Sequence, residues 1–285
     1  MRATVKYQVI FKRRDRYAVS VMCRFFDVSR SGYYNYIRRM GKPQADEPLA
    51  SMIRECQDRC GKTYGYRRVH IWLMREKSLY FNPKTVLRVM NKYGLLSEIR
   101  RRKKYKVMGE QIHRYANLLD RNFKADKPNV KWVTDISYIH TKEGVLYLSM
   151  IRDLYDNSIV AYRTGTEQTV KLVLNTIKDA MLKEKVAAEM QLHSDQGFQY
   201  TSHGYYNLTQ LYGITPSMSR RGNCYDNAMA ENFFSILKTE CIYRHKPISF
   251  DDARQLIDEY IWFYNNERIQ TKTSLTPLEK RRQAA

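Results

Sequence analysis

Three acidic residues in the second half of the chain have the types and surroundings of ligands for divalent cations. Asp135 lies inside the alternating segment KWVTDISYI, Asp195 follows the apolar segment MQLHS, and Glu231 lies in ENFFSILKTE. Carboxylate oxygens are the protein ligands that Mg²⁺ prefers, and phosphate oxygens can complete its coordination. Bound cations of this kind offset the negative charge that develops during transfer of a phosphoryl group. Three such residues could hold a cation of this kind only if the fold brings them together.

Each of the three residues also has an ordinary structural explanation. Asp favours turns because its side chain accepts hydrogen bonds from nearby backbone N–H groups. An acidic residue near the start of a helix interacts favourably with the helix dipole. The case for chemistry thus depends on the elements that position these side chains.

The elements around Asp135 and Asp195 are predicted to form a mixed sheet. In KWVTDISYI the alternation places Val133, Asp135, Ser137 and Ile139 on one face of a strand, and Asp is disfavoured inside strands unless it has a role. HTKEG predicts a hairpin turn, and Asp195 ends a later strand. The predicted order is three antiparallel strands, helix, strand, helix, strand, helix, which is an α/β fold with a mixed sheet and flanking helices.

Glu231 is predicted to lie one turn into a helix that starts after a loop. In GNCYDNAMAENFFSILKTE, Asn227 is a candidate N-cap residue. Lys238 follows Glu231 by seven residues and so lies on the same polar face, whereas Phe234 and Leu237 are available for the core. The helix therefore presents an acidic and a basic side chain on one side.

Positive charge is concentrated in the first part of the chain. The net charge is +21; residues 1–124 hold 30 basic against 10 acidic residues, and residues 125–285 hold 20 against 19. A strongly basic region joined to a nearly neutral one indicates that one part binds a polyanion while the other has a different task. Nucleic acid is the leading candidate, and an anionic membrane is less favoured because no long basic amphipathic helix is present.

The composition also indicates the cellular compartment of the protein. No apolar run approaches the roughly 18 residues of a membrane span, and no secretory signal is found at the N-terminus. Five cysteines at irregular spacing argue against a disulfide framework and against a zinc site. We therefore expect a soluble, intracellular protein.

The basic region is predicted to be helical. Residues 17–39 form the outline of a helix-turn-helix, with Ser29 as the N-cap of the second helix, although an ordinary helical hairpin fits the pattern too. Further helices follow residue 46, and Asn82 with Pro83 opens one of them. On that helix Lys84, Arg88 and Lys92 recur every four residues as a basic stripe that suits a DNA groove. A solvated charged face is the alternative reading.

Taken together, these segments resemble the DDE transposases and retroviral integrases, and most closely the second-reading-frame catalytic protein of the insertion-sequence-three family. A mid-strand Asp, a strand-end Asp and a helical Glu with 35 residues between the last two match the family's acidic triad. The resemblance covers nearly the whole chain. It is carried by SRSGYY, YGYRR, WVTDISYI, LHSDQGFQYTS, SRRGNCYDNAMAENFFSILKTE, YNNER and LTPLE.

The resemblance implies a fold, a reaction and a cofactor. It implies a ribonuclease H-like catalytic core in which Asp135, Asp195 and Glu231 are the catalytic and metal-binding residues. Two Mg²⁺ ions, with Mn²⁺ as a substitute, are expected at this triad. Water first nicks DNA at the element's end, and the freed 3′-hydroxyl then attacks another phosphodiester, without a protein nucleophile. Lys238 matches a basic residue that contacts the transposon end.

The expected partners and domains follow from the same resemblance. The partners are double-stranded DNA, both the terminal inverted repeats and the target, further copies of the chain on DNA, and an upstream-frame segment without which activity is uncertain. The domains are a helix-turn-helix-like segment (1–45), a helical, winged-helix-like DNA-binding domain (46–106), a linker (107–126), the catalytic core (127–245) and a C-terminal helical tail (246–285).

Several further side chains are candidates for DNA contact or for support of the site. His193 is expected to be a structural neighbour of Asp195, with a supporting role at the metal site as the alternative. Tyr264 is expected to pack in the core. The DNA-contacting candidates are Lys84, Arg88, Lys92, Arg100, Arg101, Arg102, Lys103, Lys104, Arg220, Arg221, Lys238 and Arg268.

Three rival functions remain at this point. A tyrosine recombinase would need an Arg and His constellation that the sequence does not supply. A DNA-binding regulator with the same fold but no chemistry would explain the basic region equally well. A ribonuclease H-like nuclease that only hydrolyses would cut DNA without joining it.

Overall fold

The structure is a computed structural model that describes residues 2–40, 45–98, 115–186, 190–220 and 224–284. The chain divides into two compact units, residues 1–54 and 55–285, and each is described by itself. Among the described residues, no helix has the length and apolar character needed to cross a membrane.

The first unit contains three short helices around a small core. They are α1 (Ala3–Arg13), α2 (Val19–Phe25) and α3 (Arg30–Met40). Asp27 has a φ of 49°, in the left-handed region, and thereby ends α2. The Ser29 hydroxyl accepts a hydrogen bond from the Gly32 N–H at 3.1 Å, which confirms Ser29 as the cap of α3. Ile10, Cys23 and Tyr33 are buried in the core.

The second unit begins within α4 (Glu47–Arg59) and continues with α5 (Tyr66–Glu76) and α6 (Pro83–Lys92). The Asn82 side chain accepts a hydrogen bond from Lys84 N, so the predicted cap and first-turn pair is confirmed. Gln57 of α4 donates to the carbonyls of Tyr64 and Leu95 and ties the start of α5 to the end of α6.

A five-stranded sheet forms the centre of the second unit. Its order is β3-β2-β1-β4-β5, with β1, β2 and β3 antiparallel and with β4 and β5 parallel to β1. The predicted mixed sheet with flanking helices is confirmed. The strands are β1 (Lys131–His140), β2 (Val145–Asp153), β3 (Ile159–Gly165), β4 (Gln191–Ser194) and β5 (Thr215–Met218).

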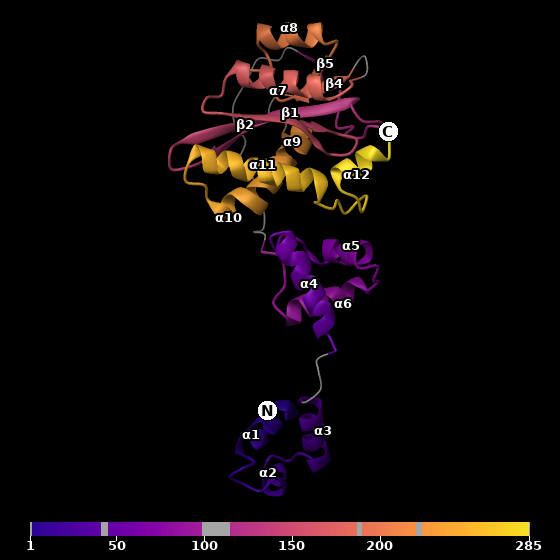
Figure 1. The fold of residues 1–285 in the computed structure, drawn as a ribbon, viewed down its shortest axis with the longest axis vertical. Coiled ribbons are helices and arrows are strands. Elements are labelled where there is room, and N and C mark those ends of the chain that lie inside the picture. The colour runs from indigo at the N-terminus through magenta and orange to yellow at the C-terminus, as the bar shows by residue number, and fades with distance from the viewer. Residues whose placement is uncertain (1, 41–44, 99–114, 187–189, 221–223, 285) are drawn as a thin grey trace. The chain divides into compact units, whose positions relative to one another are not determined.

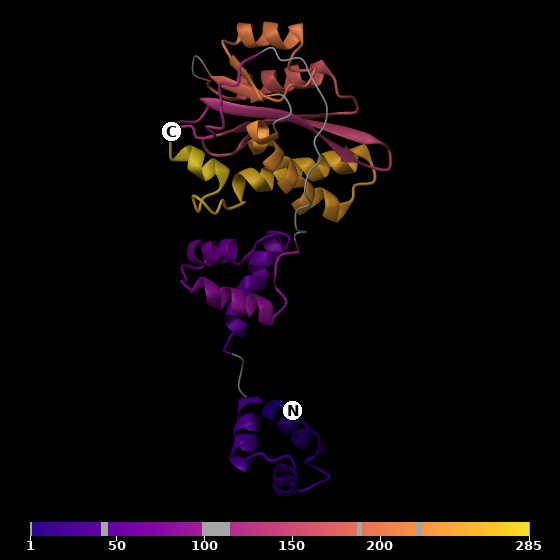
Figure 2. The same cartoon turned by 180° about the vertical axis from the view of Figure 1, so that it is seen from behind.

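Helices cover both faces of the sheet (Figure 1). One face, which includes Trp132 and Ile151, packs against α7 (Val170–Lys183) and α8 (His203–Leu211). The opposite face, which includes Val133 and Ile139, packs against α9 (Ala228–Leu237) and α11 (Phe250–Asn266). Figure 2 shows the same layers from behind. Asp135 shares the face of Val133 because side chains alternate along a strand.

The last 40 residues are part of the same core. After α9 the helix continues as a π-helical turn, η2 (Lys238–Ile242), and then as the short α10 (Tyr243–His245). Ala253, Ile257 and Ile261 of α11 are buried in the cluster that contains Val133, so this segment packs on the same face of the sheet. α12 (Pro277–Arg282) ends the described chain and opens with a capping box at Thr276.

Candidate active site

The register of the two central strands places Asp135 and Asp195 side by side. β1 and β4 are parallel, and Val133 is the partner of His193 in the ladder. Continued by two residues, the same register sets Asp195 level with Asp135, on strands that lie about 4.8 Å apart. The charge of Asp195 raises the pKa of Asp135, which agrees with two carboxylates that lie close together.

Asp195 lies one residue beyond the end of β4, and a tight turn holds its carboxylate. Its Oδ1 accepts a hydrogen bond from Gly197 N at 2.9 Å. A Cβ at position 197 would lie 3.0 Å from that Oδ1 and 3.0 Å from Gln199 Oε1, so any larger residue would crowd the carboxylate. The turn therefore holds the carboxylate of Asp195 at the C-terminal end of β4.

The electrostatics of the pair reflect two acids brought together in a partly buried place. Burial, followed by the charge of Asp195, raises the pKa of Asp135 well above its usual range. Burial also raises the pKa of Asp195. Hydrogen bonds from Ile136 N to Asp135 Oδ1 (2.7 Å) and from Gly197 N to Asp195 Oδ1 oppose these shifts. Both acids are therefore harder to ionise than an exposed carboxyl.

The start of α9, which carries Glu231 in its first turn, is tied to β1, the strand of Asp135, and to the neighbouring β2. Asn227 donates to the carbonyl of Thr134 at 3.4 Å. Arg152 of β2 donates to the carbonyl of Met229 at 2.5 Å. Glu231 is close enough that its charge also raises the pKa of Asp135. Across the described ranges, no three His, Cys, Asp or Glu side chains are already gathered tightly enough to hold a metal ion.

Lys238 faces the same region from the far end of α9. Its Nζ lies 4.6 Å from the centre of the Tyr138 ring. Burial lowers the pKa of Lys238, while the negative charge of Asp135 opposes that shift. The ammonium group therefore lies within the electrostatic field of the acidic site.

The predicted basic stripe lies on one exposed face of α6. Lys84, Arg88 and Lys92 are all exposed, whereas Val86 and Met90 are buried on the opposite side. This is the arrangement that a groove-binding helix needs. The predicted contacts at Arg100, Arg101, Arg102, Lys103, Lys104 and Arg221 lie outside the described residues.

Two predicted DNA contacts are already engaged with acids of the chain. Arg268 is 4% exposed, and its Nε and Nη2 donate to the two oxygens of Glu240 at 2.8 and 2.6 Å. This placement corrects the expectation that Arg268 touches phosphate, because its donors are sealed in the interior. Arg220 remains at the surface, where it pairs with Asp120 and Asp226.

His193 and Tyr264 have structural roles. His193 is fully buried between the hydroxyls of Ser217 (2.8 Å) and Ser219 (3.2 Å), and burial lowers its pKa to about 4. The ring is therefore neutral at physiological pH and links β4 to β5. Tyr264 is buried, and its hydroxyl accepts a hydrogen bond at 3.2 Å from Arg152, the residue that anchors α9.

Asp226 is a residue of the site region that sequence reasoning missed. Its carboxylate has no exposed surface and accepts hydrogen bonds from Arg220 N (3.0 Å), Asn117 Nδ2 (2.9 Å) and Arg121 Nε (2.9 Å). Burial alone would raise the pKa of Asp226, but the hydrogen bonds from Arg220 and Arg121 lower it on balance. These hydrogen bonds therefore hold in place the segment that leads into α9. The sequence signal that could have identified Asp226 is the segment YDNAMAE, in which it precedes Glu231 by five residues.

Comparisons with known proteins agree with this architecture. Two family models described as an integrase core domain match residues 125–224 and 231–284, and a model of an HTH-like domain matches residues 43–103. The chain is 35% identical over 277 residues to the putative transposase InsK for insertion sequence element IS150 of Escherichia coli, covering 97% of this chain and 98% of the relative.

Two further similarities extend the comparison. Transposase InsF for insertion sequence IS3A of Escherichia coli is 32% identical over 264 residues, covering 90% of this chain and 91% of the relative. Among solved structures, the catalytic core domain of HTLV-2 integrase in complex with magnesium is similar with a TM-score of 0.46 and 14% identity, over 55% of this chain and 98% of that one.

Proposed function

This chain belongs to the insertion-sequence-three family of transposases, and on that premise we propose that Asp135, Asp195 and Glu231 are its catalytic, metal-binding triad. The family is one of DDE-type enzymes that transfer DNA strands. The observation that carries the proposal is the level placement of Asp135 and Asp195 along neighbouring parallel strands. Glu231, in the first turn of α9, adds its charge to the same place.

The donor set fits a hard divalent cation. All three side chains offer oxygen, which suits Mg²⁺ and also Mn²⁺. The raised pKa values of Asp135 and Asp195 show the unfavourable charge density that a cation would relieve. Integrase-type cores depend on divalent metal in general, and we propose two Mg²⁺ ions here. When bound, such ions make water a stronger nucleophile and offset the charge on phosphate.

The chain's own residues bind and orient the DNA. Lys238 places a cation beside the acidic site, where it can contact a phosphate of the element's end. The α6 stripe of Lys84, Arg88 and Lys92 binds the terminal repeat in the HTH-like region. The proposed reaction has two steps. Water attacks the phosphodiester at the element's end, whose P–O3′ bond breaks to leave a 3′-hydroxyl on the element. That hydroxyl then attacks a target phosphodiester, forming a new P–O bond while the P–O3′ bond of the target strand breaks and its 3′-oxygen leaves as a hydroxyl.

The proposed assembly includes more than one chain. DNA binding and assembly on DNA follow from an HTH-like region joined to an integrase core. Binding of an upstream-frame segment, and a nucleoid-associated location in a bacterial cytoplasm, are further parts of this proposal.

The test is strand transfer on DNA that carries the element's own terminal repeats. Asp195→Asn keeps the size and the bond from Gly197 N but removes the charge. It should abolish Mg²⁺-dependent joining and leave gel-shift binding to the ends intact. Asp179→Asn is the matched control, because Asp179 is a surface acid paired with Arg163. Full joining activity in Asp195→Asn would refute the triad.

The same assay separates the rival functions. A hydrolysis-only nuclease would give cut ends without joined products. A regulator without catalytic activity would shift the DNA but yield no Mg²⁺-dependent product, even with the unchanged chain.

A further inference from the structure

Two motifs that the active site does not use, YGYRR (64–68) and YNNER (264–268), meet each other in the second unit. We propose that they form an intrachain docking site that fixes the HTH-like region onto the integrase core, with Glu240 at its charged centre. We propose further that this docking positions the helix that bears Glu231 and Lys238. This second part rests on the proposed function of that helix.

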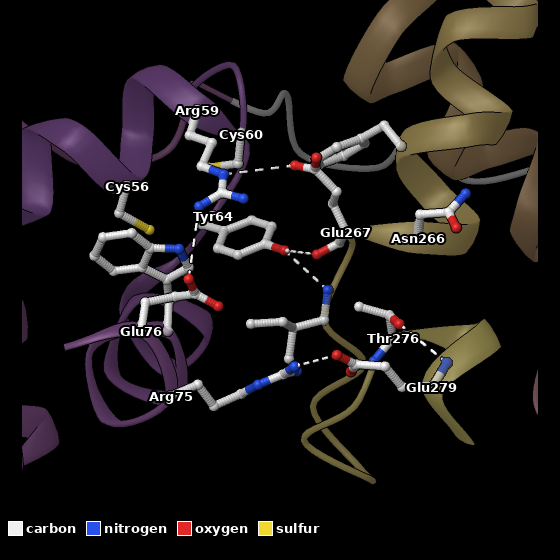
Figure 3. Close-up of a pocket in the computed structure, with 13 residues that line it drawn as sticks. Cys56, Arg59, Cys60, Tyr64, Arg75, Glu76, Asn266, Glu267, Thr276 and Glu279 are labelled. Atoms are coloured by element: carbon white, nitrogen blue, oxygen red, sulfur yellow. Dashed lines mark hydrogen bonds and ion pairs between the residues drawn. The ribbon is translucent and has the colours of Figure 1, made fainter. Parts of the chain in front are cut away.

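Hydrogen bonds to backbone atoms define the docking site. The Tyr64 hydroxyl donates to the carbonyl of Glu267 at 3.1 Å and accepts from Ile269 N at 2.9 Å. Figure 3 shows this hydroxyl between the two groups. Arg68 Nε donates to the carbonyl of Ile269 at 3.0 Å. Tyr64 is 2% exposed, so these bonds are made in the interior, where a missing partner is costly.

Glu240 supplies the charge at the centre of the docking site. Its carboxylate, 5% exposed, accepts two hydrogen bonds from Arg268 and one from the Tyr260 hydroxyl at 2.6 Å. Arg68 Nη1 lies 4.0 Å from Glu240 Oε1. Burial, followed by the positive charge of Arg268, lowers the pKa of Arg68, and the charge of Glu240 opposes both effects. Glu240 therefore permits the approach of Arg68 to the buried Arg268.

Charge complementarity extends outward from this centre. Arg59 Nε lies 3.7 Å from Glu267 Oε2, and Arg75 Nη2 lies 2.5 Å from Glu279 Oε1. In each pair the cation comes from the helical region and the acid from the C-terminal segment, as Figure 3 shows. Partly exposed pairs contribute little free energy but select the partner surface. Part of the positive charge of the N-terminal half thus binds the chain's own acids instead of DNA.

The π-helical turn connects the docking site to the active site. η2 continues α9 directly, and Lys238 and Glu240 lie two positions apart within it. Side chains two positions apart point to nearly opposite sides of a helix. Lys238 therefore faces Tyr138 and the acidic site while Glu240 faces Arg268 and Arg68. One continuous helix carries Glu231, Lys238 and the centre of the docking site.

The first measurement tests the docking in the full chain without DNA. Tyr64→Phe removes only the hydroxyl, so hydrogen exchange of the Ile269 amide should accelerate by roughly 5- to 30-fold. Arg67→Gln is the control, because Arg67 is the exposed neighbour of Arg68 and should leave that exchange unchanged. Unchanged exchange in Tyr64→Phe would overturn the docking site.

The second measurement tests the positioning. Tyr64→Phe and Arg68→Gln should lower Mg²⁺-dependent joining several-fold while gel-shift affinity for the terminal repeats is kept. Arg68→Lys retains the charge that faces Glu240 and should restore part of the joining. Faster exchange with unchanged joining would refute the positioning. If the unchanged chain joins no strands, the proposed function fails, whereas the exchange measurement still decides the docking.

Discussion

Replacement of Glu240 by Gln should destabilise the fold strongly, because Glu240 is the only acid that faces the Arg268 guanidinium among the described residues. The substitution keeps the side chain's size and removes one negative charge. Both Glu240 and Arg268 are about 5% exposed or less, and two hydrogen bonds of 2.6 and 2.8 Å join them. Arg68, 4.0 Å away, would also lose its counter-charge.

The expected size follows from the burial of the pair. Removal of one partner from a buried ion pair costs about 3–5 kcal/mol, because the other charge stays in the interior without compensation. Each kcal/mol shifts the midpoint of thermal unfolding by about 2–4 °C in a unit of roughly this size. Glu240→Gln should therefore lower the midpoint by roughly 6–20 °C.

The effect should also depend on pH in a defined direction. Burial alone would raise the pKa of Glu240, but the hydrogen bonds and charge of Arg268 lower it on balance. A carboxyl with a lowered folded-state pKa stabilises the fold above its unfolded-state pKa, and that stability is lost as the pH falls through the folded-state pKa. The gap between the unchanged chain and Glu240→Gln should therefore be widest at neutral pH and shrink in acid.

Calorimetric or circular-dichroism melting at neutral and acidic pH measures both effects. Glu259→Gln is the matched control, because Glu259 is an exposed acid on α11 and should change the midpoint by less than about 2 °C. Two results would refute the role of Glu240 as the buried counter-charge of Arg268. One is a change in the melting midpoint of Glu240→Gln of less than about 2 °C. The other is a difference in midpoint from the unchanged chain that does not become smaller in acid.

Three further predictions concern the site itself. Asp135→Asn should raise the melting midpoint of the metal-free chain while abolishing strand joining. An acid with a raised folded-state pKa destabilises the fold as the pH rises from its unfolded-state to its folded-state pKa, so the gain should vanish in acid. Lys238→Gln should weaken binding to the terminal repeats and lower the salt dependence of that binding by about one phosphate contact, as gel shifts at several salt concentrations would show. Asp226→Asn should accelerate hydrogen exchange at Arg220 N–H, because its neutral oxygen is a weaker acceptor; unchanged exchange would contradict the assigned role.

Local patterns were sufficient to predict the elements that carry the site. Alternation in KWVTDISYI placed Val133, Asp135 and Ile139 on one face, and Val133 and Ile139 are indeed buried on the face covered by α9. The strand end at Ser194 and the first-turn position of Glu231 are also as predicted. These features depend on short periodicities and on turn residues, which a sequence displays directly.

The contacts between distant segments could not be predicted from the same patterns. Arg268 was a candidate for contact with DNA phosphate, yet it pairs with Glu240 in the interior. Asp226 sits in a recognised motif, but its partners Asn117 and Arg121 are more than 100 residues away. Which distant residues contact each other depends on how the elements pack in three dimensions. Local sequence propensities do not contain that information.

Because the π-helical turn η2 joins Glu231 to Glu240 in one helix, the number of residues between them should not change. Loss of Thr239 from η2 would set Lys238 and Glu240 next to each other, about 100° apart around the helix instead of on nearly opposite sides. The two side chains could then no longer face the acidic site and Arg268 at the same time. Insertions and deletions should therefore be absent here among active relatives, even where substitutions are tolerated.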